Sequence, residues 1–259
     1  MADTNNPTRQ VMRHIGLTLG VAALVATAFT AWTPTSLDPG EIAGELASAL
    51  EDRPTPISPF IEGIVPGEPL RVGIVAGHSG PHPDTGQVDP GSICADGFTE
   101  RELNAQVVTR VAAALELAGF EVDILDEWDT NLYGYRAVAL VSIHADSCQP
   151  INEYATGFKV AAAVDTSVPD RAQRLVDCMV DRYSRNTGLR FHAGSITRDM
   201  TSYHTFGEID GDTPAVIIET GFLYLDRDLL TSRMDDVARG IVEGILCYIN
   251  NEPAGVPWD

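Results

Sequence analysis

From residue 70 onward, short apolar runs alternate with longer amphipathic stretches. The apolar runs are rich in Val, Ile, Leu and Ala, which is typical of buried strands. They span residues 70–76, 120–125, 137–143, 157–163 and 214–219. Apolar residues at helical spacing predict helices over residues 99–118, 169–187 and 232–250. This alternation predicts a single α/β domain over residues 70–252, with a mostly parallel central sheet flanked by helices.

The N-terminal part follows a different pattern. Residues 15–32 form an uncharged, almost wholly apolar run of 18 residues, and Arg9 and Arg13 precede it. Such a run is typical of an export signal, and it is also just long enough to span a bilayer as a helix. A cleaved signal peptide and a retained anchor both fit, and we favour the anchor because the run exceeds a typical signal core. In both cases residues 1–14 stay in the cytoplasm as a basic flank, and the remainder is exported.

Two compositional features refine this outline. Residues 33–69 contain seven prolines, which predicts an extended linker between the apolar run and the domain. The formal charge of −20 argues against nucleic acid as a partner and against a polybasic contact with anionic lipid. Lys159 is the only lysine in the chain.

Four polar residues lie where an α/β sheet places its ligand crevice. His78 follows the first predicted strand, His144 ends the third, and Glu219 ends the last. Glu100 opens the helix that follows the first strand. Because the carboxyl ends of parallel strands lie at one edge of the sheet, we expect these side chains to meet there.

Two histidines and one carboxylate make a three-ligand catalytic zinc site that leaves a position for water. Zinc lowers the pKa of water to about 7, and a second carboxylate is then needed as general base and acid. Near the first helix, Glu100 and Glu102 compete for the ligand role. Thr99 to Glu102 has the pattern of a capping box, which would occupy Glu102 locally and leave Glu100 free to reach the metal.

The segments around these residues resemble the zinc-dependent N-acetylmuramoyl-L-alanine amidases of the type 3 catalytic family. They are Gly-His-Ser-Gly at 77–80, Glu-Arg-Glu-Leu-Asn at 100–104, Ser-Ile-His-Ala-Asp at 142–146 and Pro-Ala-Val-Ile-Ile-Glu-Thr-Gly-Phe at 214–222. Each segment alone is a weak signal, but the four occur in the order of the family.

The resemblance implies that His78, Glu100 and His144 bind one zinc ion and that Glu219 is the catalytic glutamate. It also implies the reaction, which is hydrolysis of the amide between N-acetylmuramic acid and L-alanine in bacterial peptidoglycan. We expect Glu219 to take the proton of the attacking water and return it to the leaving amine. The expected enzyme is a monomer that works outside the cytoplasm.

The chain departs from the family pattern in two places. Val75-Ala76 stands where Asp-Pro is usual, and Tyr224-Leu225 stands where Ser-Asn is common. Some members carry a long inserted helix that blocks the site, after the strand that follows the second zinc histidine. Here only a few residues separate Ala163 from Pro169, so we expect a constitutively open cleft.

Two other functions remain open at this point. A zinc exopeptidase acting on free peptides would use the same residues, with Arg136 or Arg198 holding the terminal carboxylate. A non-catalytic, membrane-tethered wall-binding module would show the loss of a ligand or of the base, and neither is lost. Fold-level analogy does not choose between substrates.

The remaining histidines carry weaker signals. His82 lies in a Pro/Gly-containing loop and is expected to be solvated. His192 and His204 flank an irregular segment, residues 191–212, which we expect to form one wall of the cleft.

The four cysteines allow three pairings. Cys94 precedes Glu100 by six residues, and Cys148 follows His144 by four. If both ligands meet one metal, these cysteines lie on the same rim, so we favour a Cys94–Cys148 disulfide over two free thiols. Cys178 and Cys247 fall on predicted helices and are expected to be plain core residues without a bond. An even number of cysteines fits an exported protein.

Overall fold

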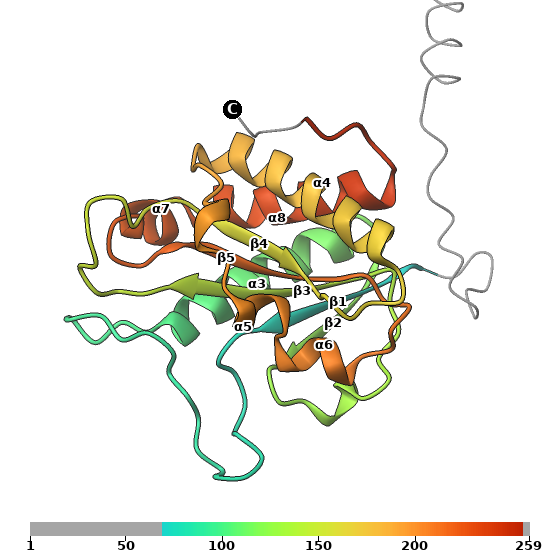
Figure 1. Ribbon diagram of the computed structural model, residues 1–259, viewed down its shortest axis with the longest axis horizontal. Helices are drawn as coiled ribbons and strands as arrows, with labels where there is room; N and C mark the ends of the chain where they lie inside the picture. Colours follow the sequence, from blue (N-terminus) through green and yellow to red (C-terminus); the bar gives the residue numbers. More distant parts are fainter. Residues whose placement is uncertain (1–68, 256–259) are drawn as a thin grey trace, which may run out of the picture. The chain divides into compact units, whose positions relative to one another are not determined.

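The computed structural model describes residues 69–255, which contain a five-stranded sheet in the order β2-β1-β3-β5-β4 (Figure 1). The strands are β1 (Arg71–Ala76), β2 (Glu121–Asp126), β3 (Ala139–Asp146), β4 (Lys159–Ala162) and β5 (Ala215–Phe222). The pairs β2–β1, β1–β3 and β3–β5 are parallel, whereas β4 pairs antiparallel with β5 at one edge of the sheet. The predicted α/β domain with a mostly parallel sheet is therefore confirmed.

The predicted apolar run of residues 15–32 lies outside the described residues, as does the linker apart from Pro69. Within residues 69–255, no helix is both long enough and apolar enough to cross a membrane.

Three long helices pack against one face of the sheet, and Figure 1 shows them stacked on the same side. They are α3 (Glu100–Leu117), α4 (Pro169–Thr187) and α8 (Met234–Ile249). Their apolar side chains form one core with alternate residues of the strands, such as Val72 and Ile74 of β1. Burying this face gives the domain most of its hydrophobic stabilisation.

In the described part of the chain, the other face of the sheet carries only short elements, whereas α7 (Arg227–Ser232), after β5, adds Leu229 and Leu230 to the core of the long helices. The short elements are η1 (Thr130–Leu132), η2 (Ala193–Ser195), α5 (Arg198–Thr201) and α6 (His204–Glu208). Small apolar clusters pack beneath them, around Leu140 of β3 and Ile217 of β5. Side chains alternate between the faces of a strand, so His144 and Glu219 project toward this thinly covered face.

Strands β3 and β5 continue beyond their predicted ends at residues 143 and 219. Their backbones stay paired with His144 beside Glu219, and the register shifts only between His144 and Asp146. The two side chains therefore lie within the strands, near the carboxyl ends, and the sheet fixes their spacing.

Two disulfides cross-link the domain. Cys94 and Cys148 join the segment before α3 to the segment after β3, with their Cα atoms 5.1 Å apart. Cys178 of α4 and Cys247 of α8 form the second bond, so the expectation that they are unbonded core residues was wrong. The sequence shows that both residues face the core, but only the packing of α4 along α8 brings them together. Disulfides form in oxidising compartments, in agreement with export.

Candidate metal centre

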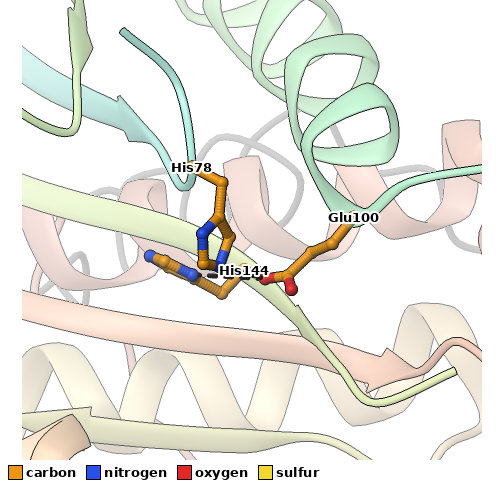
Figure 2. A group of neighbouring side chains, drawn as sticks. All are labelled: His78, Glu100 and His144. Carbon is orange, nitrogen blue, oxygen red and sulfur yellow. Dashed lines mark ion pairs between the residues drawn. The ribbon is translucent and has the colours of Figure 1, made fainter. Parts of the chain in front are cut away.

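Three predicted ligands converge at the carboxyl edge of the sheet (Figure 2). His78 follows β1, Glu100 is the first residue of α3, and His144 lies in β3. One oxygen of Glu100, Oε1, lies 3.1 Å from His78 Nε2 and 3.3 Å from His144 Nδ1. Their possible ligand atoms all lie within 4.8 Å of one another. Two imidazole nitrogens and a carboxylate oxygen are the donor set of a catalytic zinc site.

His78 is held in a backbone conformation that few side chains adopt, with φ at 61°. Its backbone N–H donates to Glu127 Oε2 at 2.6 Å, and its ring nitrogen Nδ1 lies 3.1 Å from Asp89 Oδ2. These contacts hold the side chain with Nε2 toward Glu100. A non-glycine residue at positive φ is strained, and such strain often accompanies function.

Glu100 is buried, and its backbone N–H donates to the carbonyl of Ser92, in the loop before α3, at 2.9 Å. Its carboxylate accepts hydrogen bonds from the backbone N–H groups of Ser92 and Ala145, at 3.0 and 3.1 Å. Thr99 and Glu102 form the predicted capping box, in which each side chain accepts the backbone N–H of the other residue. Glu102 is thus occupied at the helix start, and Glu100 is the glutamate that faces the histidines.

Two glycines allow the ligands to come this close. A Cβ atom on Gly77 would lie 2.4 Å from His144 Cε1, and one on Gly91 would lie 2.6 Å from Glu100 Oε2. Asn104, one turn after Glu100, donates to the Gly77 carbonyl at 3.1 Å and fixes this close approach.

The pKa shifts of the candidate ligands are also those expected of a site that binds a divalent cation. Burial lowers the pKa of His78, but the hydrogen bond and charge of Glu100 outweigh it and raise this pKa to about 9. Burial disfavours the charged form of Glu100, yet hydrogen bonds from His144 and His78 hold its pKa well below the usual range. In the absence of metal, protons on the histidines therefore balance the carboxylate, and a divalent cation could replace that positive charge.

Glu219 lies beside this group in a cleft of about 570 Å³. Its Oε2 is buried and has no hydrogen-bond partner among residues 69–255. Burial raises the pKa of Glu219, and nearby Asp146 adds to this against the opposing effect of His144, which leaves it at about 7. A carboxyl group that titrates near neutrality can both accept and return a proton.

Two further residues, Glu127 and Tyr203, also line the cleft, and neither was predicted from the sequence. Glu127 follows β2 directly, at the same edge of the sheet as the ligands, and this placement was a signal that could have identified it. Tyr203 lies between α5 and α6, and no pattern in the sequence marks it. Asp199, Met200 and Tyr203 make the segment 191–212 one wall of the cleft, as expected.

Neither His192 nor His204 lines this cleft. His204 instead stacks on Trp128, with ring centroids 3.8 Å apart, and its Nε2 lies 3.4 Å from Glu127 Oε1. The ring of His82 contacts the same Trp128 at 4.7 Å, so this loop histidine packs against an aromatic side chain instead of being simply solvated.

Fold and site together define a class of protein: a mixed α/β domain with a candidate metal-ligand group and an adjacent buried carboxyl group in one cleft. A family model described as N-acetylmuramoyl-L-alanine amidase matches residues 72–247, so the chain belongs to this family. It is an enzyme that hydrolyses the amide between N-acetylmuramic acid and L-alanine in peptidoglycan.

Solved structures show the same fold. The amidase Ami1 of Mycobacterium smegmatis has 20% identity and a TM-score of 0.54, over 71% of this chain and 98% of its own. An N-acetylmuramoyl-L-alanine amidase of Clostridium difficile 630 has 20% identity and a TM-score of 0.55, over 72% and 100%. The catalytic domain of CwlV from Bacillus (Paenibacillus) polymyxa has 22% identity and a TM-score of 0.53, over 70% and 98%. A search of curated proteins found no match.

Proposed function

We propose that this amidase is zinc-dependent, that His78, Glu100 and His144 hold the ion, and that Glu219 transfers the proton. The observation that carries the proposal is the position of Glu219. It lies in the same cleft as the three converging ligands, and its Oε2 has no hydrogen-bond partner in the part of the chain that the structure describes. When bound, zinc supplies a Lewis acid that polarises a carbonyl group and acidifies water.

In this proposal Glu219 acts as base and then as acid. Its ionised carboxylate accepts a proton from the attacking water and returns it to the amine of L-alanine as the amide bond breaks. Strand pairing holds Glu219 directly beside His144, so the proton acceptor stays next to the place where the ion binds. No serine or cysteine nucleophile is required, and all four cysteines are in disulfides.

We also propose that the cleft admits its polymeric substrate without an activator. Support comes from the connection between β4, which ends at Ala162, and α4, which begins at Pro169. It is too short to hold the blocking helix found in some relatives.

The exopeptidase alternative receives no support from the cleft. Arg136 pairs with Asp210 at 2.7 Å, and neither Arg136 nor Arg198 is among the residues that line the cleft. Within the described part of the chain, its lining contains no arginine or lysine to hold a terminal carboxylate. A wall-binding module without turnover would not require Glu219 beside a complete ligand set.

The proposed setting is the outer side of the membrane, with residues 15–32 as anchor and residues 33–69 as linker to a monomeric catalytic domain. A tether of this kind would raise the concentration of the enzyme at the wall. The two disulfides support an oxidising location.

The test is digestion of purified peptidoglycan with the purified full chain, followed by mass spectrometry. The expected products are peptides that begin with free L-alanine, and their release should stop with a chelator and resume with zinc. Shortening of free stem peptides without release from the glycan would instead indicate an exopeptidase. Activity that survives complete metal removal would refute zinc dependence.

A further inference from the structure

His144 presents its two ring nitrogens to different partners. Nδ1 faces Glu100 at 3.3 Å, on the side where the ligands converge. Nε2 lies 3.4 Å from the hydroxyl of Tyr203, whose ring meets the imidazole edge-on at 5.4 Å. The hydroxyl of Tyr203 in turn donates to Glu127 Oε1 at 3.0 Å.

The direction of these hydrogen bonds follows from Glu127, the last residue in the series. An ionised carboxylate only accepts, so the Tyr203 hydroxyl must give its proton to Glu127. The oxygen of Tyr203 is then an acceptor for His144, which keeps a proton on Nε2, so that Nδ1 is the nitrogen whose lone pair becomes free when a cation replaces its proton. The nitrogen with the free lone pair is the one that faces the other ligands.

Glu127 supports the other histidine as well. Its second oxygen, Oε2, accepts the backbone N–H of His78 at 2.6 Å, in the residue with φ of 61°. The carboxylate is buried, with a relative exposure of 7%, and it follows β2 at the end of an edge strand. Glu127 thus contacts both histidine ligands. It accepts the backbone N–H of His78 directly, and it reaches His144 through the hydroxyl of Tyr203.

We propose that Tyr203 and Glu127 are positioning residues of the metal centre, which select the Nε2-protonated form of His144 and hold His78 in its strained conformation. Neither residue binds the ion itself. The inference rests on the proposed zinc site, and it assigns to two residues a role that the ligand set alone does not include. Partners of this kind orient metal-ligating histidines, and losing one typically costs ~10- to 100-fold in metal affinity.

The test compares Tyr203→Phe with a matched control, Tyr133→Phe, in the full chain. Tyr203→Phe keeps the ring and removes only the hydroxyl, whereas the side chain of Tyr133 is exposed. Competition with a chromophoric chelator should show zinc affinity ~10- to 100-fold weaker for Tyr203→Phe and unchanged for Tyr133→Phe. In the zinc-loaded protein, the ring proton on His144 Nε2 should give a downfield NMR signal that Tyr203→Phe shifts or loses by solvent exchange.

Glu127→Gln provides a second variant of nearly the same size. An amide has one oxygen, so it cannot accept from both Tyr203 and the His78 backbone. We expect weaker zinc binding again, with the circular dichroism spectrum of the folded protein retained.

The outcomes separate this inference from the proposed function. If the wild-type chain binds no zinc, the proposed function fails and this inference fails with it. If the wild type binds zinc and cleaves peptidoglycan, but Tyr203→Phe keeps full zinc affinity and the Nε2 proton signal, only this inference is overturned. A raised KM with unchanged zinc affinity would also overturn it, because Tyr203 would then be a substrate contact.

Discussion

Lys159 lies directly opposite Glu219 across the antiparallel pair of β4 and β5. This only lysine of the chain is buried, and its ammonium group forms an ion pair with Asp146. The pKa of Glu219 is raised mainly by burial; Asp146 raises it further, and Lys159 lowers it. The charge of Asp146 disfavours the ionised form of Glu219, and the ammonium group of Lys159 offsets part of this effect.

Lys159→Met should shift the acidic limb of the pH–rate profile to higher pH. Without the ammonium group, the charge of Asp146 acts unopposed on Glu219, so its pKa rises and less of the base is ionised below neutrality. We expect kcat/KM at pH 6 to fall roughly tenfold, with a smaller loss at pH 9. The double variant Asp146→Asn/Lys159→Met removes both charges and should move the limb back toward lower pH. A profile identical to wild type in Lys159→Met would show that the lysine charge does not act on the base.

Glu219→Gln should keep zinc and the fold while losing turnover. The substitution retains size and shape and removes only the charge and basicity, and general acid–base catalysis typically contributes ~10²–10⁴-fold. Zinc content by atomic emission and release of peptides that begin with L-alanine measure the two properties separately. Glu153→Gln, at an exposed position, is the control. Loss of zinc in Glu219→Gln would make Glu219 a ligand, and Glu100 would then be the candidate base.

Gly77→Ala should weaken metal binding although residue 77 offers no ligand. Its Cβ would lie within 2.6 Å of three atoms of the His144 ring, so the ring or the strand end must move. We expect zinc affinity to fall at least ~10-fold, as for other changes that misalign a ligand. Gly207→Ala is the matched control, because a Cβ at Gly207 meets open space. Equal affinities of the two variants would show that the close approach of residue 77 does not matter.

Features of this domain that depend on local sequence patterns could be predicted, whereas those that depend on long-range packing could not. The strands and long helices could be predicted because strands buried on both faces and amphipathic helices leave clear patterns. The antiparallel direction of β4 could not, since an apolar run has no direction, and helices as short as α5 and α6 have too few turns to show periodicity.

The same limit applies within the site. Glu100 could be distinguished from Glu102 because a capping box is a local pattern. Tyr203 lies 59 residues from His144, and the pairing of Cys178 with Cys247 spans 69 residues. Contacts over such separations depend on how helices and strands pack in the folded domain, and local sequence patterns do not predict this packing.

The two disulfides should have separable roles. Removing either bond as a double Cys→Ala variant should lower the free energy of unfolding by ~2–5 kcal/mol, because each closes a long loop. Only loss of Cys94–Cys148 should also weaken zinc binding, since this bond joins the segment before Glu100 to the segment after His144. Denaturant unfolding and chelator competition, on both variants, measure the two effects. Equal zinc affinities in both variants would leave Cys94–Cys148 with a purely stabilising role.

Metal removal should make stability depend on pH in a defined window. The pKa of His78, about 9 in the folded metal-free protein, exceeds its ordinary value of 6.5, because the hydrogen bond and charge of Glu100 outweigh burial. Below pH 6.5 the imidazole is protonated in both states, and its favourable pairing contributes fully. As pH rises through about 9, the folded protein loses that proton and with it the stabilisation.

The melting temperature of the chelator-treated protein should therefore fall between pH 6.5 and 9. Zinc competes with the same protons, so its affinity should rise over this window, and the gain in melting temperature on adding zinc should grow with it. Thermal unfolding with and without zinc at several pH values measures both trends. Burial raises the pKa of Glu127, but the hydrogen bond from His204 and the charges of His144 and His78 outweigh it and lower this pKa to about 2. Glu127 therefore affects stability only in acid, where stability is lost as pH falls from 4.5 toward 2. A zinc-induced gain that stays constant from pH 6.5 to 9 would contradict proton competition at His78, and so would a gain that shrinks.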